Sequence, residues 1–433
     1  MQPQRFLRVL TTAVTIILLS LTIVSTVWGA EYKVIYRFRD AAPSSRMLVF
    51  DADGNPYGTT SWGGDLGCGT VFKLSLNPDG TWTKSVLYSF ACGSDGMNPD
   101  GAIVFDKAGN IYGTTAWGGG TGCDGGCGTV FQLAPNPNGT WTENVLYRFA
   151  GGRDGVEPVE VTIDDAGNLY GTTYFGGGGS CVASPYGGCG TVFELTPNPD
   201  GSWTYKVLRR FNVDNYEYVN GVYPWSGLIF DATGNLYGVT MNGGTGGPGC
   251  DRWFGCGAVY KLTPKPDGSW SESVLYSFQA GPDGLGPRSD LIFDAAGNLY
   301  GTTASGGIGH CEYADTWPGC GTVFMLTPKP DGTWVEKKLH VFKGKDGGWP
   351  VAGMSFDLAG NLYGTTQWGG AYESGVVFKL TPQPDGGWMF SKTRVFKQGQ
   401  HPSAGLVMDA AGNLYGTTIS GGKGYGVVFR ITP

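Results

Sequence analysis

The segment Asp-x-x-Gly-Asn-x-Tyr-Gly recurs seven times along this chain of 433 residues. Its copies begin at Asp51, Asp106, Asp164, Asp231, Asp294, Asp357 and Asp409, at intervals of 55, 58, 67, 63, 63 and 52 residues. Intervals this close to one period predict that each copy is one structural unit with loops of variable length. Repeats of this size are typical of propellers and solenoids, whose units contact mainly their neighbours.

The repeat that begins at Gly101 predicts four strands and no helix. Residues 101–105 form a short apolar run that ends in an Asp-Lys-Ala-Gly-Asn turn, and residues 111–115 form a second strand rich in β-formers. A glycine-rich loop leads to a third strand over 128–133, and a Pro-Asn-Pro-Asn-Gly turn leads to a fourth over 141–149. Four antiparallel strands per repeat are typical of a propeller blade. We therefore predict an all-β, seven-bladed β-propeller.

The two ends of the chain supply complementary parts of one blade. The last repeat contains a second strand and a third strand at 426–431, and the chain then ends at Pro433 without a fourth. Near the N-terminus, Val-Ile-Tyr-Arg-Phe at 34–38 resembles the fourth strands of the first two repeats. We predict that this segment completes the seventh blade and closes the ring, because closure removes the strand edges that a solenoid would leave exposed.

Residues 1–30 are interpreted as a signal peptide, and residues 31–433 as one propeller domain. Arg5 and Arg8 precede an apolar stretch over 9–27, and small residues follow at 29–30. The alternative is an uncleaved membrane anchor, because the stretch is about long enough to span a bilayer. Its serine and threonine content and the nearby first strand favour cleavage. We expect a secreted protein, extracellular or periplasmic, with no stable membrane span after cleavage.

The charge of the mature chain disfavours one class of partner. Removal of Arg5 and Arg8 changes the formal net charge from −7 to −9. Phosphate binding relies on clustered lysines and arginines, so we do not expect nucleic acid as a partner.

Ten cysteines are predicted to form five disulfides, each within one blade. Four pairs lie in the loops between second and third strands: Cys123 with Cys127, Cys181 with Cys189, Cys250 with Cys256, and Cys311 with Cys320. Cys68 occupies the slot of Cys127, and Cys92 follows the fourth strand of the same blade, so these two are expected to pair across adjoining loops. Zinc is disfavoured because no Cys-x-x-Cys spacing occurs and the chain has three histidines.

The repeat unit resembles a bacterial family. Its run Leu-Ile-Phe-Asp-x-x-Gly-Asn-Leu-Tyr-Gly-Thr-Thr, followed by Gly-Gly and Gly-Cys-Gly-Thr-Val-Phe, is similar to the GloVer repeat (Gloeobacter and Verrucomicrobia type) of exported proteins. The likeness covers essentially all of the mature chain. It implies a secreted or surface-attached propeller, distantly similar to NHL-repeat propellers. It implies no established reaction and provides no functional residues to transfer.

Loop variability predicts which face of the ring binds a ligand. The Asp-x-x-Gly-Asn and Pro-Asp-Gly-Thr-Trp turns hardly vary and are expected on one face, the hairpin face. The cysteine loops and the connections from fourth to first strands vary and are expected on the other, the disulfide-loop face, where binding residues concentrate. Its irregular candidate ligand-binding aromatics are Trp225, Trp253, Phe254, Trp317 and Trp349.

A second group of candidate ligand-binding aromatics recurs in one slot, two residues after the Thr-Thr pair. This group comprises Trp62, Trp117, Phe175 and Trp368. Packing between blades is the alternative role, because a residue repeated in each blade usually serves the repeat itself. The hairpin aspartates, the glycines in the middle of the second strands and the tryptophans that open the fourth strands are expected to be structural.

The Pro-Asp-Gly-Thr-Trp turn is similar to the Asp-box of sialidase-type propellers, but that pattern separates Asp from Gly, which adjoin here. Sialidase chemistry would also need a converging arginine cluster. Among the loop arginines in the middle of the chain, only Arg252 and Arg288 are placed for one. We therefore do not expect sialidase activity.

Two functions from different classes remain. The first is a non-catalytic binding or interaction module for an extracellular glycan or protein; the second is a hydrolase or lyase that acts on a polysaccharide or another polymer. His310, His340 and His401 show no partner spacing, and no serine-hydrolase elbow or phosphate loop occurs, which favours the first. A central cluster of carboxylates with raised pKa values would favour the second. We expect a monomer without a cofactor and predict no catalytic residue.

Overall fold

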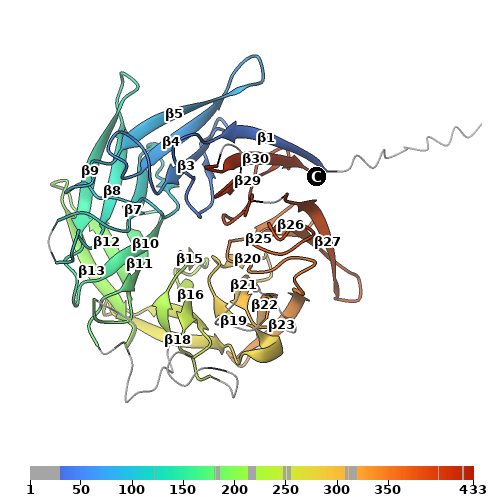
Figure 1. Ribbon diagram of the computed structural model, residues 1–433. Coiled ribbons are helices and arrows are strands. Elements are labelled where there is room, and N and C mark those ends of the chain that lie inside the picture. The colour runs from blue at the N-terminus through green and yellow to red at the C-terminus, as the bar shows by residue number, and fades with distance from the viewer. Residues whose placement is uncertain are drawn as a thin grey trace, which may run out of the picture.

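The computed structural model is a closed ring of seven β-sheets (Figure 1). It describes residues 30–433 except 121, 180, 182–185, 213–220, 247–249, 251–254, 308–310, 312–318, 398 and 422–423. Each sheet is one blade, built from strands that follow one another in the chain and pair antiparallel. The predicted seven-bladed propeller is therefore confirmed.

The first strand of each blade lies nearest the middle of the ring, and the fourth lies at the rim (Figure 1). Blades 1 to 3 consist of β2 (Val49–Phe50), β3 (Pro56–Thr60), β4 (Thr70–Leu76) and β5 (Trp82–Ser89); β6 (Val104–Phe105), β7 (Ile111–Thr115), β8 (Thr129–Pro135) and β9 (Trp141–Arg148); and β10 (Val156–Ile163), β11 (Leu169–Phe175), β12 (Thr191–Pro197) and β13 (Trp203–Arg210).

Blades 4 and 5 have a divided inner strand, and a short 3-10 helix, η1 (Gly281–Asp283), precedes blade 5. Blades 4 to 7 consist of β14 (Val222–Pro224), β15 (Ile229–Phe230), β16 (Leu236–Asn242), β17 (Ala258–Pro264) and β18 (Trp270–Ser277); β19 (Leu285–Pro287), β20 (Ile292–Phe293), β21 (Leu299–Ser305), β22 (Thr322–Pro328) and β23 (Trp334–Val341); β24 (Ser355–Phe356), β25 (Leu362–Thr366), β26 (Val376–Pro382) and β27 (Trp388–Val395); and β28 (Val407–Met408), β29 (Leu414–Thr418), β30 (Val427–Thr432) and β1 (Glu31–Arg37).

The inner strands are shorter than the sequence predicts. The apolar run at 101–105 gives a strand only at Val104–Phe105, and six of the seven blades contain a two-residue inner strand, whereas β10 of blade 3 has eight residues. A proline precedes these strands, and it has no N–H to donate to the ladder. The segment between the proline and the short strand therefore runs beside the second strand without regular pairing, which leaves its side chains available for other contacts.

The ring closes between β1 and β30. These strands pair antiparallel from Glu31 opposite Thr432 to Arg37 opposite Val427, with one irregularity between Val34 and Tyr36. β1 thus provides the fourth strand of the blade that contains β28, β29 and β30, although it comes from the other end of the chain (Figure 1). The predicted closure by the N-terminal strand is confirmed.

One aromatic contact repeats at all seven blade interfaces. A ring at the end of each fourth strand packs on a ring in the third strand of the next blade, with centroids 5.1–5.4 Å apart. The pairs are Phe38–Phe72, Phe90–Phe131, Phe149–Phe193, Phe211–Tyr260, Phe278–Phe324, Phe342–Phe378 and Phe396–Phe429. The interface made by β1 is therefore equivalent to the other six.

Glycines in the second strands make room for these rings. A Cβ added to Gly301 would lie 2.5 Å from Cζ of Phe324 and 3.0 Å from Cδ2 of Leu291. No side chain fits there without a shift of the core, because interiors are close-packed. The expected close approach at these glycines is confirmed.

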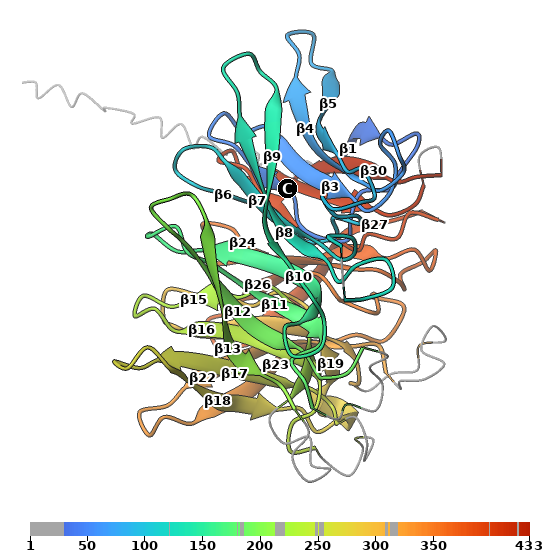
Figure 2. The same ribbon diagram turned by 90° about the vertical axis from the view of Figure 1, so that its left-hand side faces the viewer.

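The hairpin aspartates accept hydrogen bonds inside their own turns, as predicted. Asp231 accepts from the N–H groups of Thr233 and Asn235 and from the Tyr237 hydroxyl. The third-to-fourth-strand turns lie on the same face of the ring, and the hairpin between β12 and β13 projects to the left in Figure 2. The opening tryptophans of the fourth strands cover a tyrosine of the preceding blade; Trp203, for example, contacts Tyr112 edge to face at 6.1 Å.

All five predicted disulfides are present. They join Cys68 to Cys92, Cys123 to Cys127, Cys181 to Cys189, Cys250 to Cys256, and Cys311 to Cys320. Among the residues that the structure describes, no helix is long and apolar enough to span a bilayer. The proposed signal peptide lies outside these residues, apart from Ala30.

Candidate functional site

The residue before the inner-strand proline has a left-handed backbone in six of the seven blades. These residues, which we call the pre-proline ring, are Asn98, Glu157, Tyr223, Gly286, Trp349 and His401, with φ angles of 56°, 60°, 60°, 63°, 59° and 43°. This conformation is unfavourable for residues other than glycine, and a following proline restricts the backbone further. Such strain persists where the surroundings hold it, and it concentrates at functional sites.

Main-chain bonds from the preceding blade hold five of these residues. The N–H groups of Asn98, Glu157, Tyr223, Gly286 and Trp349 donate to the carbonyls of Cys68, Cys127, Cys189, Cys256 and Cys320, at 2.8–3.0 Å. Each acceptor belongs to a disulfide. The glycine that follows this cysteine packs on the inner-strand proline of the next blade. In blade 5, a Cβ on Gly321 would lie 2.6 Å from Cδ of Pro350. Each disulfide loop thus positions a side chain that the next blade presents.

Four side chains from consecutive blades form a cluster at this end of the inner strands. This aromatic–arginine cluster consists of Tyr174, Trp225, Arg288 and Trp349. The rings of Tyr174 and Trp225 meet edge to face with centroids 4.8 Å apart. The guanidinium carbon of Arg288 lies 5.4 Å from the Trp225 ring centroid and 5.3 Å from that of Trp349. Two cation–π contacts, each about 0.5–2 kcal/mol, hold the cation in one orientation.

Arg288 makes no ion pair with any residue that the structure describes. Its Nε atom is buried and has no hydrogen-bond partner. Burial lowers the pKa of the guanidinium and the nearby Tyr174 opposes this shift, but arginine remains protonated in proteins. The cluster therefore contains a fixed positive charge with unused hydrogen-bonding capacity.

Carboxyl groups lie beside the cluster on its Tyr174 side. Burial, together with the neighbouring Asp100, raises the pKa of Glu157 to about 7. Burial also raises the pKa of Tyr174 to about 12, with Arg288 lowering it and Glu157 raising it. Asp100, Glu157, Tyr174 and Arg288 therefore interact electrostatically across blades 2 to 5. Asp100 also accepts a hydrogen bond of 2.8 Å from the hydroxyl of Ser61.

A second group of charged side chains lies on the axis of the ring. Arg46 in blade 1 donates a 2.8 Å hydrogen bond to the carbonyl of Trp225 in blade 4, and such a bond between non-adjacent blades must pass through the middle of the ring. Asp290 accepts a 2.8 Å bond from the N–H of Gly227. Burial raises the pKa of Glu160, Asp290 raises it further, and Arg46 lowers it. This axial group adjoins the aromatic–arginine cluster through Trp225.

The irregular aromatics predicted as ligand contacts separate into two sets. Trp225 and Trp349 are partly buried and come together around Arg288. Trp253, Phe254 and Trp317 lie outside the described residues. Trp225 and Trp349 both contact the arginine, and their role as ligand contacts stays a prediction.

The recurrent aromatic slot is heterogeneous. Trp117 lies 5.6 Å from Tyr186, Phe175 lies 5.7 Å from Tyr223, and Trp368 lies 4.1 Å from His401, as distances between ring centroids. Three of the four thus contact other aromatic rings. Trp62 differs, with 60% of its surface exposed.

Sequence reasoning missed Glu157, Tyr223 and His401 as site residues and named Arg288 only in connection with sialidases. A signal was present, since each pre-proline residue stands directly before a proline at the start of an apolar inner run. The side chain varies completely while the proline recurs. What the sequence did not reveal was the left-handed backbone, which depends on the carbonyl supplied by the preceding blade.

The histidine analysis needs one correction. His340, predicted to have no partner, lies 2.9 Å from the carboxylate of Asp346 and stacks on Phe390 at 3.9 Å. It occupies the place of a tyrosine, because Tyr88 and Tyr147 donate to Asp95 and Asp154 in the same way. The pair is therefore part of the repeat. His310 lies outside the described residues.

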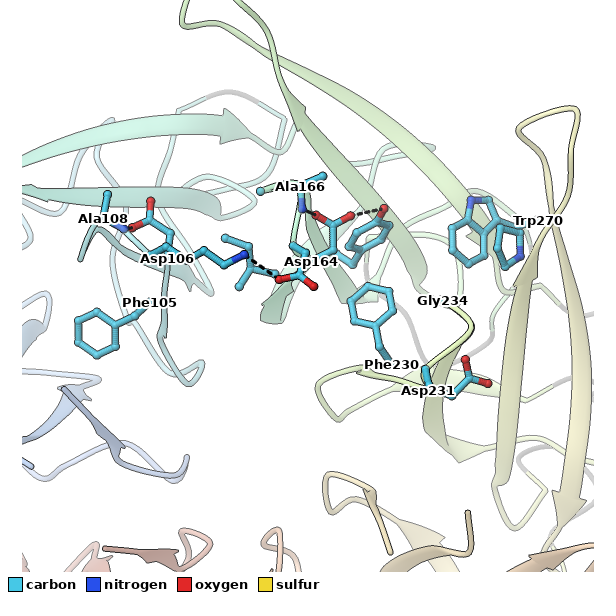
Figure 3. Close-up of a pocket in the computed structure, with 16 residues that line it drawn as sticks. Phe105, Asp106, Ala108, Asp164, Ala166, Phe230, Asp231, Gly234 and Trp270 are labelled. Atoms are coloured by element: carbon cyan, nitrogen blue, oxygen red, sulfur yellow. Dashed lines mark hydrogen bonds and ion pairs between the residues drawn. The ribbon is translucent and has the colours of Figure 1, made fainter. Parts of the chain in front are cut away.

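The hairpin face also has a hollow, of about 1010 Å³, across blades 2 to 4 (Figure 3). Phe105, Phe230 and Trp270 line it together with the turn aspartates. These carboxylates are engaged in their own turns; Asp164, for example, accepts from the N–H of Asn168 and from Tyr170. Hydrogen bonds from Asn235 and Thr233 outweigh burial and hold the pKa of Asp231 at about 2. The polar groups of this hollow therefore serve the repeat.

Opposite pKa shifts predict a maximum of stability near pH 4 to 5. Burial is the main reason that the pKa values of Glu143 and Glu157 are raised to about 7. The resulting contribution to stability is complete at a pH below the pKa that glutamate has in the unfolded chain, and it is lost as the pH rises through 7. The lowered pKa values of Asp51 and Asp231, about 2, stabilise the fold above pH 4, and this is lost as the pH falls. The urea midpoint should be higher at pH 5 than at pH 8.

Each glutamate should contribute on the order of 1–2 kcal/mol to this difference, after a discount for solvent screening. The double substitution Glu143→Gln and Glu157→Gln should reduce the slope of the profile between pH 5 and 8, to which Glu160, Glu272 and Glu336 also contribute, and leave the acid limb unchanged. An equal or higher midpoint at pH 8 in the unsubstituted protein would contradict the assignment.

Seven blades, five of which carry a disulfide, define the chain as a disulfide-containing β-propeller. The model of the Gloeobacter/Verrucomicrobia repeat matches residues 42–312 and 252–433. The chain belongs to this family, which confirms the resemblance in the sequence. In the comparison with curated proteins, no sequence matches.

Two solved structures share the fold. One is the extracellular domain of a protein from B. thetaiotaomicron described as a one component system, with a TM-score of 0.50 and 11% identity over 92% of this chain and 39% of that chain. This chain thus spans about two fifths of that relative. The other is a protein from Lactobacillus plantarum, with a TM-score of 0.51 and 15% identity over 87% of this chain and 98% of that chain. At such identities the likeness concerns the fold.

Proposed function

We propose that the protein is an exported, non-catalytic binding module whose ligand contacts the disulfide-loop face at the pre-proline ring and the aromatic–arginine cluster. The carrying observation is the ring itself: Asn98, Glu157, Tyr223, Trp349 and His401 are chemically different side chains on one repeated, strained backbone position. Residues that serve the repeat stay constant from blade to blade, as the hairpin aspartates do. Variation on a fixed and strained backbone is typical of ligand contacts.

Five disulfides support export, because they persist in the periplasm and outside the cell and are rare in the cytosol. The aromatic rings of the cluster suit a glycan or an apolar partner surface, since they offer large flat contact areas. A monomer with one such face is sufficient for this function.

The test is a binding screen of residues 31–433 against extracellular polysaccharides and proteins, followed by substitution. Trp225→Ala with Trp349→Ala should reduce affinity for any captured ligand at least tenfold while near-UV circular dichroism away from the tryptophan bands is kept. The control is Leu358→Ala with Lys107→Ala on the hairpin face, where both side chains are exposed. If the control abolishes binding and the tryptophan variant does not, the wrong face has been chosen.

A second candidate, a hydrolase or lyase acting on a polymer, is favoured by the carboxyl groups with raised pKa values at Glu157 and Glu160. Glu157 is the better placed for chemistry, because it interacts with Tyr174 of the aromatic–arginine cluster. We rank binding first since the rest of the cluster consists of aromatic rings and a cation, which hold a ligand without breaking a bond. Release of reducing ends or unsaturated products, lost in Glu157→Gln, would establish the second candidate instead.

A further inference from the structure

The charge pattern of the aromatic–arginine cluster restricts the chemistry of its ligand. Arg288 projects a guanidinium that two indole rings hold, and no described carboxylate neutralises it. Two other arginines are held by polar partners: Arg209 lies 2.7 Å from Glu272, and Arg46 donates to the carbonyl of Trp225. A partly buried cation without a counterion is unfavourable in the free protein, and an anionic ligand relieves this.

The geometry of a guanidinium favours particular anions. Its planar fork donates two parallel hydrogen bonds to a carboxylate or sulfate, and Arg288 carries this fork over the rings of Trp225 and Trp349. The Nε atom of the fork is buried and has no hydrogen-bond partner.

The groups around the arginine distinguish a saccharide from an acidic peptide. Asp100 and Glu157 lie on the Tyr174 side of the cluster, and Asn98 has a buried, unpaired side-chain oxygen. These oxygens accept hydrogen bonds from hydroxyl groups, which a saccharide has on every ring. The side chains of an acidic peptide offer carboxylates and no hydroxyl groups to these acceptors.

We propose that the ligand is an anionic saccharide, whose carboxylate or sulfate group binds Arg288 and whose hydroxyl groups bind Asn98, Asp100 and Glu157. This inference rests on the proposed function and adds the chemical class of the ligand. Trp225 and Trp349 act as positioning residues for the guanidinium and provide apolar contact beside it.

The test uses defined oligosaccharides with residues 31–433. The carboxylate probes are oligomers of galacturonate, glucuronate and mannuronate, each beside its methyl-esterified form; the sulfate probes are sulfated galactan oligomers beside desulfated ones; the peptide probe is poly-glutamate. We expect calorimetry to show binding of a charged oligosaccharide, with affinity reduced at least tenfold for its neutral form. Binding by a uronate or by a sulfated probe identifies which anion the site takes.

Two substitutions assign the charge effect to the site. Arg288→Met should reduce affinity for the charged probe at least tenfold, and Arg288→Lys should reduce it less. Neither substitution should alter the weak binding of the neutral form. Neutralising the ligand and removing the arginine both delete the same interaction, so their effects on affinity are not additive. Arg148→Met is the matched control, because Arg148 is exposed and donates only to the carbonyl of Ser94; it should leave affinity unchanged.

Three results overturn the proposal: equal binding of charged and neutral forms, unchanged affinity in Arg288→Met, or binding of poly-glutamate and of no saccharide. If a neutral saccharide or a protein binds in a way that Trp225→Ala with Trp349→Ala abolishes, the binding function stands and only the ligand class is wrong. Absence of binding by every charged saccharide in the panel also overturns the ligand class.

Discussion

A chain that begins at Ala41, and therefore lacks β1, is expected to unfold at a midpoint roughly 10 °C below that of residues 31–433. β1 provides the fourth strand of the seventh blade and pairs with β30 along most of its length. Its continuation, Phe38, is fully buried against Phe72 of blade 1. Loss of Phe38 and Ile35 alone removes about 3–6 kcal/mol of apolar burial, a large share of the stability of a typical protein.

A permuted chain provides the control. Glu31 lies opposite Thr432 in the ladder, so the residues of β1 can follow β30 through a turn copied from Asn77–Thr81, which joins β4 to β5. A chain that starts at Ala41 and carries residues 31–40 at its C-terminus should regain the midpoint. Thermal unfolding followed by far-UV circular dichroism measures both. An undiminished midpoint in the truncated chain would show that β1 does not close the ring.

Removal of the Cys311–Cys320 bridge, by Cys311→Ala with Cys320→Ala, should lower stability by about 2–3 kcal/mol and also disturb the candidate site. Cys320 belongs to blade 5, but its carbonyl accepts the N–H of Trp349 in blade 6 at 3.0 Å. A looser blade 5 loop should let Trp349 leave its strained conformation and its contact with Arg288. Near-UV circular dichroism of the tryptophan bands detects this without any ligand.

The matched control is Cys68→Ala with Cys92→Ala. This bridge supports Asn98, which is not in the aromatic–arginine cluster. The two double variants should lose comparable stability, but only the blade 5 variant should change the tryptophan signal. Identical tryptophan spectra in the two variants would show that the Cys311–Cys320 bridge does not hold the geometry of the site.

The fold was predictable because its determinants are local and repeated. The Asp-x-x-Gly-Asn turns, the mid-strand glycines and the strand spacing each appear seven times. A wrong strand assignment in one repeat is therefore corrected by the other six. The role of β1 followed from counting strands at both ends. The length of the inner strands was not predictable, because a proline stands at the same place in blade 3, where β10 has eight residues, and in blades whose inner strands have two.

The candidate site was only partly predictable. Trp225 and Trp349 were recognisable as irregular aromatics in loops, but their contact with Arg288 joins residues of three blades, and sequence order does not show which loops face each other. The pKa of Glu157 depends on burial and on Asp100 of the previous blade. These properties arise between repeats, whereas the sequence pattern describes one repeat at a time.

The pre-proline ring has a consequence for protein engineering. Its backbone is fixed by main-chain groups alone: Trp349, for example, donates its N–H to Cys320 and accepts from the N–H of Gln367. The side chain takes no part in these bonds, so the partly exposed positions can be randomised together in a display library, while Tyr223, which is buried in the core, is kept. Asparagine and glycine, which tolerate a left-handed backbone best, are the natural starting residues. The propeller would then serve as a disulfide-stiffened framework for selecting new binding specificities.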